Sequence, residues 1–273
     1  MNELTSDILP PGFDFTDPDL NWSGVPHDQF LALRRTAPIF WVEQPPESRA
    51  GMIGAPGYWA ITRHEDVSFV SKNSKVFSSH ENGAIIRMPE ETTRESVEMT
   101  QVVIINQDAP DHTALRAIIS RGFTPRAINA LEDVMEQRAR RIVSAAVAGG
   151  SGNFVEQVAA ELPLEAIAEF LGVPYEDRHK LFEWSNRMIG MDDPEYAGDD
   201  ANSAAGELFL YVDELAEQRR LDPRDDIATK LINAEIDGDR LTQHEFDMFM
   251  VLLAVAGAET TRNATTHLSL IHI

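Results

Sequence analysis

Apolar and polar positions along the chain predict a mainly helical protein with one small β-sheet. Two short apolar runs, residues 39–42 and 58–61, flank a loop that contains Ala55-Pro56-Gly57, and they predict a pair of neighbouring strands. From residue 108 onward, apolar residues recur at the three- and four-residue spacing of amphipathic helices. The fold class expected from this pattern is mainly α with a small sheet.

Start and stop signals divide the helical part into separate elements. Thr124-Pro125 opens one helix, which ends at Gly149-Gly150, and the residues LGVP at 171–174 end the next one. Residues 242–245, TQHE, form a capping box before the longest apolar run. An earlier helix follows Asp108, which we expect to cap it, and stops at Arg121-Gly122.

The pattern predicts three regions. Residues 1–77 form an entry and small β region, residues 78–106 form a polar and irregular loop, and residues 107–273 form a helical body. A loop as long as 78–106 is usually functional or mobile. No fixed-period repeat interrupts this order.

Composition narrows the function classes. The chain is 43% hydrophobic and 25% charged, as expected of a globular protein, and its net charge of −22 argues against nucleic acid as a partner. The longest apolar run, residues 248–258, is shorter than the roughly 20 residues that cross a bilayer, so we expect no membrane span. The first twenty residues are acidic and lack the order of an export signal, which predicts a cytoplasmic location.

The segment AGAETT, residues 256–261, departs from what core packing favours. A glycine inside a helix costs about 1 kcal/mol relative to alanine, and Glu259 needs a partner or water if it is buried. Ala256 and Gly257 leave room on one helix face for a flat group and a small molecule, and the Thr260 hydroxyl can bond back to the Ala256 carbonyl. The alternative is that the small residues serve close helix packing and that Glu259 points to solvent.

His112 and Arg116 lie four residues apart on one predicted helix, so their side chains share a face. Arg offers a planar fork and His a directed N–H, and together they suit the capture of carboxylates. The alternative is that both pair with acidic side chains of a neighbouring helix.

Taken together, these segments resemble the cytochrome P450 family. DAPDHTALR (108–116) and RGFTPR (121–126) resemble the C-helix signature of bacterial members, and AGAETT resembles their oxygen-binding I-helix motif. The similarity extends over essentially residues 10–267. TRN (261–263) and PGFDFTDP (11–18) resemble the actinobacterial branch that oxidises the terminal methyl of steroid side chains.

The resemblance implies a cytochrome P450 fold, truncated within the I helix, and a heme-dependent monooxygenase that hydroxylates an apolar lipid with O2, with a steroid side chain as the expected substrate. It implies that His112 and Arg116 hold the propionates of heme b, and that Ala256 and Gly257 lie over the heme face. Glu259 and Thr260 would form the acid–alcohol pair that delivers protons. Ferredoxin and ferredoxin reductase are the expected electron donors.

The loop 78–106 matches the region that contacts substrate in the family. Ile85 and Ile86 are the candidate apolar contacts within it, and Val255 on the I helix would face the same cavity. Ordinary burial is an equally good reading of these three side chains.

The sequence departs from the family in one large respect. It contains no cysteine, so it lacks the axial thiolate of the heme iron, and it also lacks the family's Glu-x-x-Arg helix. We therefore expect an amino-terminal fragment of the P450 domain, 1–273, that is inactive alone. Residues 268–273 do not resemble the family's continuation and can be back-translated to a transposon end used in sequencing libraries.

A second hypothesis comes from a different class of protein. A heme-free helical protein could use the same cavity for an apolar ligand, and the absence of cysteine favours it, whereas the combined motifs favour the monooxygenase. Metal binding by His267 and His272 is a weak third idea, because their five-residue spacing places them on different helix faces.

Overall fold

The structure of the chain is a computed structural model. It describes residues 9, 12–22, 24–44, 57–87, 92–121, 123–190, 201–236 and 238–272. The expected turn at Ala55-Pro56 and the expected stop at Gly122 lie outside these residues. The chain divides into two compact units, Met1–Ala114 and Leu115–Ile273.

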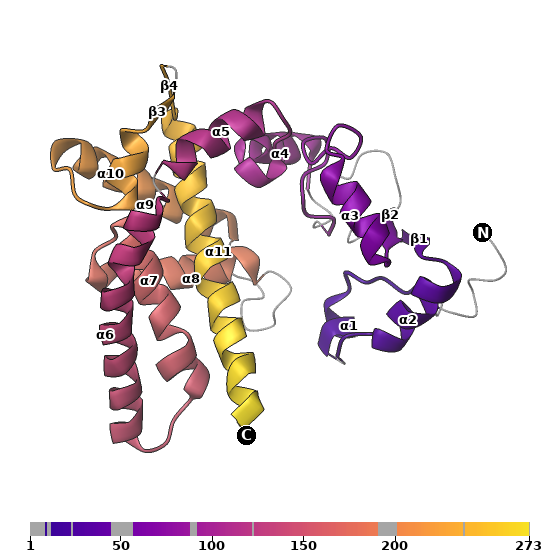
Figure 1. Cartoon of the computed structure of the whole chain (residues 1–273), viewed down its shortest axis with the longest axis horizontal. Helices are drawn as coiled ribbons and strands as arrows, with labels where there is room; N and C mark the ends of the chain where they lie inside the picture. Colours follow the sequence, from indigo (N-terminus) through magenta and orange to yellow (C-terminus); the bar gives the residue numbers. More distant parts are fainter. Residues whose placement is uncertain are drawn as a thin grey trace. The chain divides into compact units, whose positions relative to one another are not determined.

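The first unit combines short helices with one sheet (Figure 1). Its elements are α1 (Pro18–Trp22), α2 (His27–Thr36), β1 (Ile39–Glu43), β2 (Gly57–Ile61), α3 (His64–Lys72), α4 (Arg94–Met99) and two 3-10 turns, η2 (Thr100–Val102) and η3 (Ile104–Asn106). The two strands pair antiparallel with Trp41 opposite Trp59, and these rings pack edge to face at 5.2 Å. The predicted pair of strands is confirmed.

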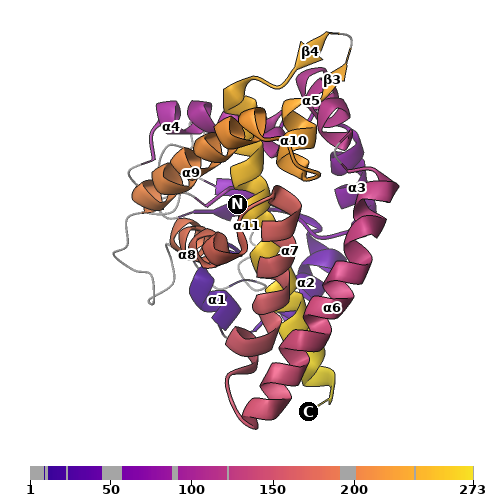
Figure 2. The same ribbon diagram turned by 90° about the vertical axis from the view of Figure 1, so that its left-hand side faces the viewer.

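The helix α5 (Asp111–Ser120) begins in the first unit and continues into the second. The other elements of the second unit are α6 (Pro125–Gly149), the π-turn η4 (Val155–Ala159), α7 (Glu161–Leu171), η5 (Tyr175–Asp177), α8 (Arg178–Ile189), α9 (Ala201–Leu221), α10 (Ile227–Ile232), β3 (Glu235–Ile236), β4 (Asp239–Arg240), α11 (Gln243–Ser269) and η6 (Leu270–His272). In Figure 2, α7 lies between α6 and α11, and it contacts both.

The core of the second unit surrounds the amino-terminal half of α11. This helix packs against α7, α8 and α9, and its Phe246 and Met250 side chains are almost fully buried. Burial of large apolar side chains supplies about 25 cal/mol for each Å² removed from water, so these contacts fix α11 within the unit. No described helix has both the length and the apolar character that a membrane span needs.

Most predicted helix boundaries agree with the structure. α6 spans Pro125 to Gly149, α7 ends before Gly172, whose φ of +80° is the left-handed conformation of a helix stop, and Thr242 caps α11. The prediction that Asp108 caps α5 is wrong. Its carboxylate instead accepts hydrogen bonds from Ser78 and Ser79, thirty residues earlier in the chain.

The predicted loop 78–106 is partly helical, which corrects the expectation of an irregular segment. Thr93 caps α4 by accepting a hydrogen bond from the Ser96 N–H at 3.1 Å, and η2 and η3 follow directly. The 3-10 turns are too short, and α4, with the sequence RESVEM, is too short and too charged, to show an apolar period in the sequence. The division of the domain at residues 77 and 106 stays a prediction.

Candidate functional site

The AGAETT segment lies in the middle of α11, which the capping box starts. The Thr242 hydroxyl accepts from the Glu245 N–H at 3.2 Å, and the Glu245 carboxylate accepts from the Thr242 N–H at 2.8 Å. Both bonds satisfy donors that a helix start leaves free. A well-anchored start and a buried first half hold the segment on a rigid element.

Two faces of α11 differ sharply around this segment. Ala254 and Ala258 are buried against the rest of the second unit, whereas Ala256 and Thr260 are exposed. The Thr260 hydroxyl donates to the Ala256 carbonyl oxygen at 2.8 Å, which is the back-bond that the sequence suggested. The exposed face therefore presents a small side chain and a hydroxyl that is held against the helix.

Gly257 lies on a side of the helix that packs against α7. A Cβ atom added here would lie 2.1 Å from Cδ1 of Ile167, so the glycine lets α7 approach α11 closely. This close approach is the packing alternative considered for the small residues. A position over the heme face stays a prediction for Gly257 and for Ala256.

Glu259 does not point freely into solvent. Its Oε1 accepts a hydrogen bond from the Arg262 guanidinium at 3.1 Å, one helical turn later, and its side chain is 32% exposed. The Arg262 guanidinium also lies over the ring of Phe182 on α8, 5.5 Å from its centre. The acid of the predicted acid–alcohol pair is thus held by a neighbouring cation at the partly open edge of the unit.

His112 and Arg116 both lie on α5, one turn apart. Within the part of the chain that the structure describes, neither side chain forms a hydrogen bond or an ion pair with an acidic residue. The alternative in which both pair with a neighbouring helix is therefore not seen there. His112 belongs to the first unit, and Glu259 and Thr260 belong to the second.

The predicted substrate contacts occupy exposed or partly exposed positions. The Ile85 side chain is 63% exposed and that of Ile86 is 38% exposed, so neither is buried in the ordinary way. Val255 is half-buried on α11, next to Ala256. Their role toward a substrate stays a prediction.

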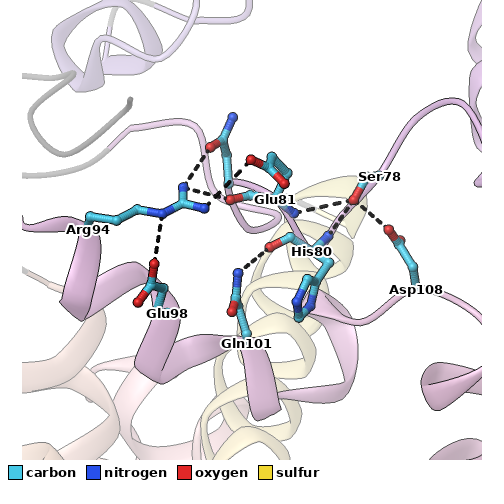
Figure 3. A network of polar contacts seen from close by, with 8 residues as sticks. Ser78, His80, Glu81, Arg94, Glu98, Gln101 and Asp108 are labelled. Carbon is cyan, nitrogen blue, oxygen red and sulfur yellow. Dashed lines mark hydrogen bonds and ion pairs between the residues drawn. The ribbon is translucent and has the colours of Figure 1, made fainter. Parts of the chain in front are cut away.

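A polar network that the sequence did not reveal surrounds the turn at residues 78–82 (Figure 3). Ser78 and Asp108 form one end of it, and Arg94 at the other end donates to the Glu81 carbonyl at 2.9 Å and to Glu98 at 3.2 Å. The hydrogen bonds from Ser78 and Ser79 lower the pKa of the Asp108 carboxyl. These partners are far apart in the chain, whereas the Glu259–Arg262 pair has the three-residue helical spacing that could have indicated it.

Among the described residues, no group of His, Cys, Asp or Glu is arranged to hold a metal ion. No family model matches the chain. Several proteins of known function are nevertheless similar to it over nearly its whole length.

Steroid C26-monooxygenase of Rhodococcus jostii (strain RHA1) is 54% identical over 259 residues, which make up 95% of this chain and 54% of that protein. The steroid C26-monooxygenase of Mycobacterium tuberculosis (strain ATCC 25618 / H37Rv) is 53% identical over 263 residues, 96% of this chain and 60% of that protein. A methyl-branched lipid omega-hydroxylase of the same strain is 38% identical over 244 residues. The chain spans 54–60% of the length of these relatives.

Solved structures agree with these relatives. A cytochrome P450 of Mycobacterium marinum in complex with pseudoionone has a TM-score of 0.78 and 33% identity, and the match covers 93% of this chain and 63% of that one. The LnmA cytochrome P450 hydroxylase of Streptomyces atroolivaceus S-140 has a TM-score of 0.72 and 29% identity, covering 90% and 61%. The predicted fold class, mainly α with a small antiparallel sheet, is confirmed.

Proposed function

We propose that this chain, which belongs to the cytochrome P450 family, forms part of a heme-dependent monooxygenase that hydroxylates an apolar lipid. One observation carries the proposal. On the exposed face of α11, the Thr260 hydroxyl bonds to the Ala256 carbonyl, and the carboxylate of Glu259 lies one residue away. An acid and an alcohol beside a face with small side chains suit proton delivery to a small molecule bound there.

The residues of this chain fit heme b. Its two propionates need donors, and His112 and Arg116 supply them from one face of α5 with no acidic partner among the described residues. Its flat ring needs an open face without bulky side chains, which Ala256 and Thr260 offer on α11. The axial thiolate is not among these residues, because the sequence has no cysteine.

When bound, the heme supplies the oxidising chemistry that places one oxygen atom of O2 into a C–H bond. His112 and Arg116 orient the cofactor by donating hydrogen bonds to its carboxylates. The Thr260 hydroxyl would release the Ala256 carbonyl and pass the proton on Oγ1 to a small molecule bound at this face, and the partly exposed Glu259 carboxylate would relay a replacement proton from water to Thr260.

The proposed substrate is a steroid side chain. The activity named for relatives of this chain supports this choice. Two of those relatives are steroid C26-monooxygenases, whereas the lower identity of the methyl-branched lipid omega-hydroxylase makes a branched fatty acid the second choice. Ile85, Ile86 and Val255 supply apolar contacts for such a molecule, and the exposed positions of the first two leave them available.

Ferredoxin and ferredoxin reductase are the proposed electron donors, since the monooxygenase reaction needs two electrons from outside the protein. Arg116, Arg121 and Arg126 would contribute locally to a basic face for an acidic ferredoxin, and the rest of that face would come from residues outside this chain. The expected cytoplasmic location rests on the acidic first twenty residues and stays a prediction.

Two measurements on the complete monooxygenase, of which this chain forms a part, test the proposal. This complete monooxygenase is called the whole protein below. After reduction and exposure to carbon monoxide, we expect the absorption band of a thiolate-ligated heme, and titration with cholesterol should shift the heme spin state. A branched fatty acid is the comparison ligand, and a larger shift with it would change the substrate class. Failure to bind heme, together with tight binding of an apolar ligand, would favour the heme-free binding protein instead.

A further inference from the structure

The Asp108 carboxylate lies at one end of the network in Figure 3, where Ser78 contacts it, and both of its oxygen atoms accept hydrogen bonds. Oδ2 accepts from the Ser78 hydroxyl at 2.5 Å, and Oδ1 accepts from the Ser79 N–H at 3.0 Å. The Ser78 oxygen in turn accepts from the His80 N–H at 3.1 Å and from the Glu81 N–H at 3.3 Å. The turn at residues 78–81 is therefore organised around one ionised side chain.

The far end of this turn is tied to the same short segment. The Ala84 N–H donates to Oδ1 of Asn106 at 2.9 Å, and the Asn106 amide donates to the Thr100 carbonyl at 3.0 Å. Gly83 makes the tight bend between the two ties, with a φ of +78°. Residues 78–84 are thus joined at both ends to Asn106 and Asp108.

Two predicted functional segments are connected to this junction. Ile85 and Ile86 follow Ala84 directly, and the Ile86 carbonyl accepts from Gln44 at 3.3 Å. On the other side, the His112 N–H donates to the Asp108 carbonyl at 2.9 Å, so the backbone of Asp108 is tied to the start of α5. One residue joins the apolar loop to the helix that carries the predicted heme donor.

A purely structural turn does not need this arrangement. Arg94 already fastens the tip of the turn through the Glu81 carbonyl and the Asn82 side chain, at 2.9 Å and 3.2 Å. The bonds of Asp108 add a connection to α5 that Arg94 does not supply. The network also lies at the surface, where it contributes little to a core. Its main effect is therefore to fix the position of the turn relative to α5.

We propose that Asp108 is a positioning residue, which holds Ile85 and Ile86 at a fixed place relative to His112 through its bonds with Ser78 and Ser79. This inference rests on the proposed function, because it needs a lipid that contacts the loop and a heme that contacts α5. Substrate affinity then depends on Asp108, although its side chain touches neither ligand.

The test uses the whole heme protein and two probes. Cholesterol binding, which shifts the heme spin state, measures whether the loop with Ile85 and Ile86 is in place. Imidazole binds the heme without contacting Ile85 or Ile86, so its Kd measures the state of the heme pocket alone. Asp108→Ala and Ser78→Ala should each raise the Kd for cholesterol about fivefold or more, with heme content and the imidazole Kd unchanged. Ser78→Thr keeps the hydroxyl, so its Kd for cholesterol should stay close to that of the unchanged protein.

Hydrogen exchange gives a readout that needs neither ligand. The amides of Ser79, His80 and Glu81 should exchange faster in Asp108→Ala than in the unchanged protein. Asp111→Asn is the matched control, because it removes the same charge from the same helix start at an exposed position with no bond to the loop. It should change neither the exchange nor the cholesterol Kd.

Each outcome decides the matter. If the amides exchange faster in Asp108→Ala but the cholesterol Kd is unchanged, the hydrogen bonds of Asp108 do not position the loop for substrate. If the exchange is unchanged, these hydrogen bonds do not hold the turn. Either result would overturn the inference. A parallel rise in the Kd values for cholesterol and imidazole would also overturn it, since it would indicate general damage to the pocket. If the unchanged protein shows no spin-state shift with cholesterol or a branched fatty acid, the proposed function itself fails.

Discussion

The Arg262 guanidinium donates to the Glu259 carboxylate at 3.1 Å, one turn along α11 from the acid that we propose to handle protons. Its exposed fraction is 18%, and it lies over the Phe182 ring, so packing restricts where this cation can move. Arg262 therefore holds the carboxylate in place, next in sequence to Thr260.

This geometry predicts that Arg262 acts through Glu259. Arg262→Ala and Glu259→Gln should each lower the hydroxylated product formed per O2 consumed by several-fold, since an unplaced or uncharged group relays protons poorly. The double variant should resemble Glu259→Gln alone. Product yield and O2 consumption are measured together in the whole protein.

Arg140→Ala is the control for this prediction, because Arg140 forms a similar one-turn pair with Glu136 on the exposed side of α6. It should leave the product yield unchanged. A double variant that is several-fold worse than Glu259→Gln would show that Arg262 has a role of its own.

Heme retention should depend on Arg116. In the proposed role, Arg116→Ala would remove a charge-assisted hydrogen bond to a propionate, which is worth about 1.5–3 kcal/mol, so the heme should leave roughly tenfold faster or more. The rate of heme loss from Arg116→Lys should lie between those of the unchanged protein and Arg116→Ala, because a point charge replaces the planar fork of the guanidinium. Transfer of heme to an excess of apomyoglobin measures the rate, and Arg121→Ala, an exposed change at the end of the same helix, should leave it unchanged.

The contact between Gly257 and Ile167 predicts a substitution whose effect changes sign with its background. Gly257→Ala gains about 1 kcal/mol of helix propensity, but its Cβ would meet Ile167 atoms at 2.1 and 2.7 Å. We expect a net loss of about 1 kcal/mol in the free energy of unfolding. With Ile167→Ala already present, the same change should stabilise, because the obstructing atoms are gone.

Chemical denaturation of the four proteins in this cycle gives the coupling energy directly. Equal effects of Gly257→Ala in both backgrounds would contradict the packing role. A loss of heme spectral signals at unchanged stability would instead support the predicted position of Gly257 near the heme face.

What the sequence could predict follows from the range of the interactions involved. The strands, the stop at Gly172 and the capping box of α11 depend on residues within a few positions of each other, so local pattern was enough. The same holds for the shared face of His112 and Arg116. The role of Asp108 could not be predicted, because its partners lie thirty residues away and a capping role fitted the local pattern equally well.

The contacts of a buried acidic side chain also could not be predicted from the sequence. Glu165 on α7 is fully buried, and its carboxylate accepts a hydrogen bond from Arg141 on α6. Arg138 on the same helix donates to the Glu165 backbone carbonyl at 3.0 Å and lies 3.7 Å from the carboxylate, and only the packing of the two helices defines these partners. The pairing of Gly257 with Ile167 is another contact between helices. Sequence pattern indicates which face of a helix is buried, but not which side chain lies opposite.

Asp247 predicts a pH dependence of stability. It is 1% exposed on α11, and burial raises the pKa of its carboxyl to about 6, helped by Asp213, although the hydrogen bond from Gln243 and the charges of His244 and Arg220 oppose the rise. In the unfolded chain this carboxyl titrates near its ordinary value of about 4. The folded state therefore binds the proton more tightly, and stability falls as the pH rises from about 4 to above 6.

Asp247→Asn should remove this loss, because the amide oxygen still accepts from Gln243 and carries no charge. We expect the variant to be more stable by about 1–3 kcal/mol at pH 7.5, with the difference shrinking toward zero near pH 4. Urea denaturation across this range measures it. Asp225→Asn should show the opposite trend, because the Lys230 partner of this exposed carboxylate lowers its pKa. A variant of Asp247 that is less stable at pH 7.5 than at pH 4.5, relative to the unchanged protein, would mean that the buried charge stabilises the contact between α9 and α11.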